Sequence, residues 1–159
     1  TKQRGSVRDM KICFAASSGG HFEQLMMLRP LMEKYESFVV TEKTGYAVKT
    51  PVKCYYLHQV NRKQWGCLLY LLKNAWYSLR LLHRERPDVV VCTGVLAMIP
   101  LCVEAKLSGR KLVYIESFAK VTSATLSGKL LYHYADRFYV QWDQMKEIYP
   151  EAVCLGGIY

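Results

Sequence analysis

Residues 11–21, with the sequence KICFAASSGGH, decide the fold of this chain. An apolar run at residues 11–16 is followed by Ser17, Ser18, Gly19, Gly20 and His21 and then by a helical pattern, which predicts a strand, a loop and a helix. Glycines let the backbone approach a ligand closely, and free amides at a helix start attract anions. The loop has neither the Gly-x-Gly-x-x-Gly spacing nor a Gly-Lys-Ser/Thr ending, so it indicates a diphosphate-bearing ligand rather than an ordinary dinucleotide or ATP.

Composition indicates one globular domain. The chain has 159 residues, of which 51% are hydrophobic and 22% charged. Its net charge of +9 favours an anionic partner, such as nucleic acid, a membrane surface or a phosphorylated substrate. Because the sequence contains no recognised nucleic-acid-binding module, we expect no nucleic-acid partner.

The six cysteines lie far apart, without a Cys-x-x-Cys pair or a Cys/His cluster. Neither a zinc site nor a disulfide framework is therefore indicated, and we expect buried free thiols, no metal and no cofactor. Residues 1–9 are polar and basic and predict a leader or disordered arm before a domain at residues 10–159, with Met10 as the natural start. No apolar run reaches the about 18 residues of a membrane span.

Strands and helices alternate along the domain. We predict strands at residues 11–16, 37–41, 54–57, 88–92, 111–115, 137–140 and 152–155. We predict helices at residues 21–35 (with a kink at Pro30), 64–86 (stopped by Pro87), 97–108, 126–134 and 144–148. Near-continuous apolar strands between helices predict an α/β fold with a single Rossmann-like, doubly wound parallel sheet.

Ligands of such sheets bind beyond the carboxyl ends of the strands. The loops there carry Ser18, Gly19, Gly20 and His21, then Thr93 and Gly94, and then Glu116 and Ser117. For the glycines, the alternative is a tight turn needed only for packing, and His21 could merely cap or pack. Glu42 mimics the ribose-binding acid of NAD-dependent folds, but the missing glycines argue against that interpretation.

The helix at residues 64–86 is apolar on more than one face. We expect one stripe to cover the sheet: Leu68, Leu72, Ala75, Leu79 and Leu82. That leaves Trp65, Leu69 and Trp76 without a core role, beside Lys73, Arg80 and further basic residues including Arg62 and Lys63. This pattern predicts interfacial membrane contact, with a fully buried helix or an oligomer contact as alternatives.

Four segments, taken together and in order, resemble one family. They read ASSGGH (residues 16–21), DVVVCTG (88–94), YIESFAKV (114–121) and SGKLLY (127–132), continued by ADRFYVQW at 135–142. The chain resembles the acceptor-binding subunit of two-component glycosyltransferases. Relatives are bacterial capsule and exopolysaccharide proteins of the PssD/EpsE/CpsF type and the membrane-anchoring subunit of the eukaryotic dolichol-linked N-acetylglucosaminyltransferase, and both are similar to the N-terminal half of MurG-type GT-B enzymes.

The resemblance implies a split enzyme. A separate catalytic partner would supply the C-terminal half and most of the UDP-sugar site, while this chain would hold a polyprenyl-diphosphate-linked sugar. Gly19, Gly20 and His21 would then contact the acceptor diphosphate, with His21 as a further candidate for the catalytic base. Glu116 would contact the acceptor sugar or, alternatively, cap the following segment with Ser117. Ser127 and Lys129 would approach the diphosphate or the partner, or merely begin a solvated helix.

We therefore expect a peripheral subunit at the cytoplasmic face of the plasma membrane. Its complex would transfer a hexose from a UDP-sugar to a capsule or exopolysaccharide precursor. Two alternatives remain: an autonomous Rossmann-type nucleotide-binding enzyme, which would turn over alone, and a non-catalytic membrane scaffold, which would tolerate substitution of His21 or Glu116.

Overall fold

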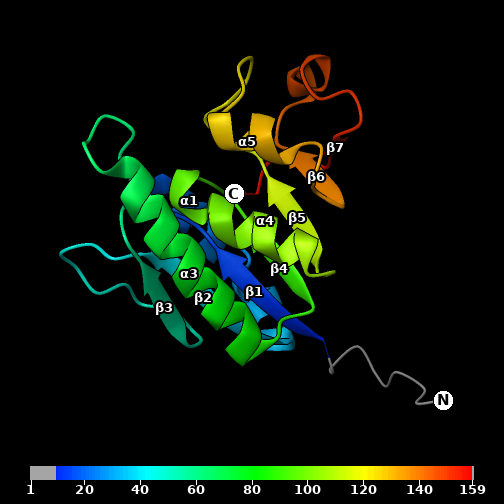
Figure 1. Cartoon of the computed structure of the whole chain (residues 1–159). Coiled ribbons are helices and arrows are strands. Elements are labelled where there is room, and N and C mark those ends of the chain that lie inside the picture. Colours follow the sequence, from blue (N-terminus) through cyan, green and yellow to red (C-terminus); the bar gives the residue numbers. More distant parts are fainter. Residues whose placement is uncertain (1–9, 159) are drawn as a thin grey trace.

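The chain folds around a parallel sheet, as a computed structural model of residues 10–158 shows (Figure 1). The predicted arm at residues 1–9 and the last residue lie outside the described part. The strands are β1 (Lys11–Ala15), β2 (Glu36–Glu42), β3 (Cys54–Leu57), β4 (Val89–Cys92), β5 (Lys111–Ile115), β6 (Arg137–Val140) and β7 (Val153–Cys154). Within residues 10–158 they form one seven-stranded sheet in the order β3-β2-β1-β4-β5-β6-β7, and every neighbouring pair is parallel. The predicted α/β class and doubly wound sheet are confirmed.

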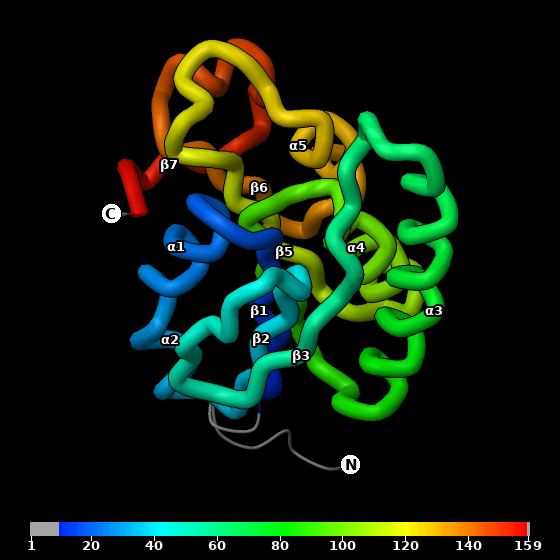
Figure 2. Tube along the Cα trace, turned by 90° about the vertical axis from the view of Figure 1, so that its left-hand side faces the viewer, coloured from blue at the N-terminus to red at the C-terminus, as the bar shows by residue number. Residues whose placement is uncertain are grey.

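Helices cover both faces of the sheet. They are α1 (Gly20–Met26), α2 (Arg29–Lys34), α3 (Cys67–Glu85), α4 (Ile99–Leu107) and α5 (Leu126–Leu131), with 3₁₀ turns at Leu96–Met98 (η2) and Asp143–Glu147 (η3). Figure 2 shows α1 and α2 on one side of the strands and α3 and α4 on the other. The strand order reverses between β1 and β4, and the loops after these two strands therefore meet at the switch point where α/β sheets bind ligands.

Strand β1 is buried on both faces, as its unbroken apolar run predicts. Ile12 and Phe14 pack with Leu25 and Met32 from α1 and α2. Cys13 and Ala15 belong to the larger core on the opposite face, together with residues of α3, α4 and α5. Strand β1 is therefore held by packing on both of its faces.

The single kinked helix expected at residues 21–35 is instead two short helices. Helix α1 ends at Met26, and α2 begins at Arg29 with Pro30 in its first turn. Proline lacks an amide hydrogen and its ring collides with the carbonyl four residues earlier, so it fits only at a helix start. The interruption therefore lies just before Pro30.

The expected inward stripe of α3 is wrong at three of its five positions, whereas Leu82 is buried as expected and Ala75 is half-buried. Leu68, Leu72 and Leu79 are exposed, with 71% of Leu68 accessible, whereas Asn74, Ser78, Leu81 and Leu82 are buried. Polar Asn74 is tolerated inside because its amide donates to the carbonyl of His58 and accepts from the His58 amide, both at 2.8 Å. The most apolar face of α3 is thus turned away from the sheet.

The face of β5 and β6 that lies toward α2 bears an apolar groove of about 410 Å³. The groove is lined by Leu28 and Leu31, by Val113, Ile115 and Tyr139 of the strands, and by residues 155–158. Within the described residues, no helix is long and apolar enough to cross a bilayer.

Candidate functional site

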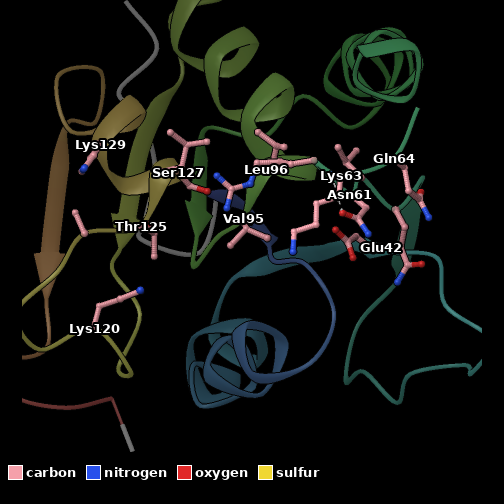
Figure 3. A pocket seen from close by; sticks show the side chains of 15 residues that line it. Glu42, Asn61, Lys63, Gln64, Val95, Leu96, Lys120, Thr125, Ser127 and Lys129 are labelled. Atoms are coloured by element: carbon pink, nitrogen blue, oxygen red, sulfur yellow. Dashed lines mark hydrogen bonds between the residues drawn. The ribbon is translucent and has the colours of Figure 1, made fainter. Parts of the chain in front are cut away.

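A cavity of about 780 Å³ lies beyond the carboxyl ends of the strands. Figure 3 shows Glu42, Asn61, Lys63 and Gln64 on one side, Lys120, Thr125, Ser127 and Lys129 on the other, and Val95 and Leu96 between them. One side comes from β2 and the loop before α3, and the other comes from the loop after β5 and the start of α5. Its volume suits a ligand of drug-like size.

The cavity is basic. Arg62, Lys63, Lys120 and Lys129 line it, and among the described lining residues Glu42 is the one acid. Converging cations attract phosphate groups, which can be bound without a metal. Within residues 10–158, no three His, Cys, Asp or Glu side chains converge in a way that could hold a metal ion.

The glycine loop lies beside this cavity and is fixed by the loop after β4. The Ser17 amide donates to the Gly94 carbonyl at 2.7 Å. Gly19 has a φ of 78°, a conformation that favours glycine, and both Gly19 and Gly20 are exposed. The glycine loop is therefore exposed at the surface, and its contact with a ligand stays a prediction.

His21 is held by Thr93. Its Nδ1 lies 3.0 Å from the Thr93 carbonyl, and the Thr93 hydroxyl donates to the His21 carbonyl at 2.8 Å. Because a carbonyl only accepts, Nδ1 carries the hydrogen, and Nε2 of the neutral ring is then an acceptor. Gly94 has a φ of 112°, and a Cβ there would lie 3.2 Å from His21 Nδ1. Thr93 and Gly94 are buried and act here as the support of His21.

Ser18 connects the glycine loop to the cavity. Its hydroxyl donates to Oε2 of Glu42 at 3.1 Å. Burial raises the pKa of the Glu42 carboxyl, while the hydrogen bonds from Ser18 and the nearby His21 oppose that rise. Glu42 is only 6% exposed.

Glu116 is fully buried, and its carboxylate is satisfied inside the protein. It accepts hydrogen bonds from the amides of Ser117 (2.9 Å) and Thr125 (3.2 Å). It also accepts from the hydroxyls of Thr125 (2.8 Å) and Tyr149 (3.0 Å). The capping alternative for Glu116 and Ser117 matches these contacts, and contact with a sugar would require the segment at residues 117–125 to open.

Glycine is needed at position 128 because a Cβ there would collide with Oε2 of Glu116 and lie 2.7 Å from the Tyr149 hydroxyl. Burial and the adjacent Glu116 carboxylate also raise the pKa of the Tyr149 hydroxyl above its usual value. Glu116 thereby fixes the loop that brings Lys120, Thr125 and Ser127 to the cavity.

The residues predicted to contact a membrane are all exposed on or next to α3. Trp65 is fully exposed, Leu69 and Trp76 are more than half exposed, and Lys73 and Arg80 also lie at the surface. The Arg80 guanidinium stacks 4.7 Å from the Trp76 ring centre. We call Trp65, Leu68, Leu69, Leu72, Trp76 and Leu79 the outer face of α3.

Sequence comparison identifies the family. The model described as "Oligosaccharide biosynthesis protein Alg14 like" matches residues 12–158. The chain belongs to the Alg14 family. It is 40% identical over 179 residues to the human UDP-N-acetylglucosamine transferase subunit ALG14, covering 94% of this chain and 83% of that protein. The rat ALG14 subunit is 33% identical over 181 residues, covering 95% and 84%.

This Alg14-family chain shares its fold with parts of larger proteins of known structure. Acinetobacter baumannii MurG matches with a TM-score of 0.70 and 15% identity over 85% of this chain and 42% of that one. Methanocaldococcus jannaschii UDP-GlcNAc 2-epimerase matches with a TM-score of 0.73 and 13% identity over 93% and 47%. The chain spans less than half of these proteins, and the likeness to MurG agrees with the expected half of a GT-B fold.

Several cavity residues of the Alg14-family chain were not selected from the sequence as ligand-binding. The segment at residues 59–64 and Lys120 line the cavity, whereas the sequence pattern places Arg62 and Lys63 on the membrane-contacting surface. Ser127 and Lys129 also line the cavity. That position is compatible with the alternative in which they approach the diphosphate. The usable signal was the polar and basic run QVNRKQ between a strand and a helix.

Proposed function

We propose that this chain is the acceptor-binding subunit of a split glycosyltransferase. It would hold a polyprenyl-diphosphate-linked sugar while a catalytic partner transfers a sugar from a UDP-sugar. The names of its relatives specify UDP-N-acetylglucosamine, which we therefore propose as the donor. A lipid-linked glycan, such as a capsule or exopolysaccharide precursor, would be the product.

The observation that carries this proposal is the basic cavity at the switch point of the sheet. Its four cations can neutralise a diphosphate, and its volume leaves room for an attached sugar. The glycine loop adds exposed backbone beside it. Gly19, Gly20, Ser127 and Lys129 thus remain our proposed diphosphate contacts, now joined by Lys120.

His21 has the features that a proton acceptor needs. Its ring is oriented by the Thr93 carbonyl, which leaves Nε2 as the acceptor atom. A neutral imidazole oriented in this way can accept the proton of the attacking hydroxyl group. We propose this role for His21. Before the transfer, its Nε2 would accept a hydrogen bond from the attacking hydroxyl group of the acceptor.

The outer face of α3 is our proposed membrane contact. Its tryptophans and leucines are exposed, and Lys73 and Arg80 flank them. Trp65 directly follows Gln64, which lines the cavity, so an acceptor whose lipid tail stays in the bilayer could reach the cations. This geometry supports peripheral attachment to a membrane, and we propose the cytoplasmic face as the side of attachment.

Membrane contact can be tested with the double variant Trp65→Ala/Trp76→Ala. We expect its partition onto vesicles containing anionic lipid to fall at least about tenfold, because both rings lose their interfacial burial. Tyr46→Ala, which removes an 84% exposed ring elsewhere, is the matched control. Unchanged partition of the double variant would contradict the assignment.

The apolar groove on β5 and β6 is our proposed contact for the catalytic partner. Parallel sheets are normally covered on both faces, and this groove leaves Val113, Ile115 and Tyr139 partly open. Apolar side chains of the partner would complete the cover.

The central experiment measures transfer from UDP-N-acetylglucosamine to a polyprenyl-diphosphate-linked N-acetylglucosamine. This chain, its partner and their mixture are assayed separately, and activity is expected from the mixture alone. Lys120→Ala/Lys129→Ala should raise the acceptor KM about 10- to 100-fold, since two charge-assisted contacts are lost. Lys34→Ala, at an exposed position of α2 outside the cavity, is the control.

The outcomes separate the alternatives. Full turnover by this chain alone would favour an autonomous nucleotide-binding enzyme. Full activity of a His21→Gln complex, combined with unchanged acceptor binding by the lysine variant, would favour a scaffold. Either result would contradict the split acceptor site.

A further inference from the structure

Glu42 stands out among the residues of the basic cavity. It is the last residue of β2, it is 6% exposed, and it is the one acid among the described lining residues. Lys120, Ser127 and Lys129 lie across the cavity from it (Figure 3). A carboxylate placed here weakens the attraction of the cavity for anions, so its presence calls for another explanation.

The contacts of Glu42 differ from those of Glu85 and Asp136, two other partly buried carboxylates. Glu85 pairs with Lys11 at 2.7 Å and accepts from the Tyr55 hydroxyl. Asp136 pairs with Lys106 at 2.6 Å and accepts from the Leu112 amide. Within residues 10–158, no lysine or arginine lies within ion-pair distance of Glu42, whose hydrogen-bonding partner is Ser18. A buried carboxylate with so few donors does not stabilise the fold.

The missing donors can come from a ligand. Sugar hydroxyl groups donate hydrogen bonds to carboxylates, whereas phosphate oxygens are repelled by them. The cavity therefore has two chemically different sides: Lys120, Lys129 and the Ser127 hydroxyl lie on one, and Glu42, the one acid among the described lining residues, lies on the other with Lys63. A diphosphate joined to a sugar matches this division, and a diphosphate alone does not.

We infer that Glu42 recognises the sugar of the acceptor, its carboxylate accepting hydrogen bonds from sugar hydroxyl groups while Lys120 and Lys129 hold the diphosphate. This inference rests on the proposed function and adds a specificity-determining residue to it. Ser18 orients the carboxylate through its hydroxyl, and thereby joins the sugar end of the cavity to the glycine loop. The site would thus select a lipid diphosphate that already carries a sugar.

The test compares two probes on the full chain. One is a short-chain polyprenyl diphosphate, and the other is the same lipid bearing a single N-acetylglucosamine. We expect the wild-type chain to bind the sugar-bearing probe more tightly. Glu42→Gln should lower that preference roughly 10- to 100-fold, as expected for loss of hydrogen bonds to a charged acceptor, and should bind the sugar-free probe at least as well.

Glu36→Gln is the matched control, because Glu36 lies at the opposite end of the same strand and its side chain is 71% exposed. Glu42→Asp keeps the charge and should retain part of the preference. A thermal melt of each variant shows that it is folded.

Two results would overturn the inference while leaving the proposed function intact. One is an unchanged preference in Glu42→Gln, and the other is an equal loss of affinity for both probes. Failure of the wild-type chain to bind either lipid diphosphate would instead overturn the proposed function and the inference together.

Discussion

Glu42 and Glu116 stand at the same edge of the sheet, on either side of the central strands β1 and β4, but in opposite surroundings. Four donors from the chain surround the Glu116 carboxylate. Glu42 has Ser18 as its hydrogen-bonding partner and lines the cavity. Glu42 ends one strand and Glu116 directly follows another, and the sequence predicts a ligand contact for Glu116 but not for Glu42.

The difference separates two uses of a buried charge. When the chain supplies all the donors, the carboxylate organises the loop around it and is closed to ligands. When the chain supplies few, the remaining acceptor capacity is available in the cavity. For these two carboxylates, the number of donors that the chain supplies therefore separates the structural group, Glu116, from the one that can bind a ligand, Glu42.

The largest effect is expected from Glu116→Gln. The amide of glutamine places a donor against groups that already donate, so the free energy of unfolding should fall by about 3 kcal/mol. Glu42→Gln, the matched variant, should change it by less than about 1 kcal/mol. Urea denaturation of both variants measures this contrast, and equal losses would remove the distinction.

Gly128→Ala tests the same closed network from its other side. The added methyl group collides with Oε2 of Glu116, and overpacking of this kind costs about 1–3 kcal/mol. Gly20→Ala is the control, since a Cβ there meets nothing within 4 Å and alanine favours the first turn of α1. Similar melting temperatures for the two variants would show that the network tolerates displacement.

Glu104 on α4 provides a third carboxylate, away from the cavity. Its Oε2 is buried without a hydrogen-bond partner in the described chain, and burial raises its pKa from 4.5 to about 7. Between these values the native state keeps a proton that the unfolded state has lost, so stability should fall as the pH rises from 4.5 to 7. Because the residue is half-buried and partly screened by solvent, we expect the free energy of unfolding to fall by about 1–2 kcal/mol over this pH range.

Glu104→Gln should flatten that part of the stability profile, measured by denaturation at several pH values. A profile that keeps its slope in this variant would assign the dependence to another group.

The smallest effect is expected from Ser18→Ala. Removing one hydroxyl donor should cost less than about 1 kcal/mol. It should also raise the pKa of Glu42 further, since the Ser18 hydrogen bond lowers it. Carbon-13 NMR titration of the Glu42 carboxyl carbon measures this shift, and an unchanged pKa would mean that Ser18 does not hold the carboxylate.

Most strands could be predicted from the sequence because a strand buried on both faces is a continuous apolar run. Residues 11–15 and 89–92 are clear examples. The interruption before Pro30 followed from the same local chemistry, although we expected a kink there rather than two helices. Local sequence rules predict the structure where residues close together in the sequence determine it.

The orientation of α3 could be predicted only in part, because periodicity shows which face is apolar but not what that face contacts. The polar pair of Asn74 and His58 joins residues 16 positions apart, and no pattern along the chain reveals it. The division of labour between Glu42 and Glu116 depends in the same way on donors such as Tyr149 and Ser18, which are distant in sequence.

The sheet order has a consequence for synthesis of the chain. Strand β1 is central, with β2 on one edge and β4 on the other, yet β4 is made only after the whole of α3. A nascent chain therefore emerges from the ribosome with one backbone edge of β1 unpaired, and open edges are templates for aggregation. The exposed apolar residues of the outer face of α3 emerge during the same interval. A chaperone or the membrane would therefore be the first partner to cover that face.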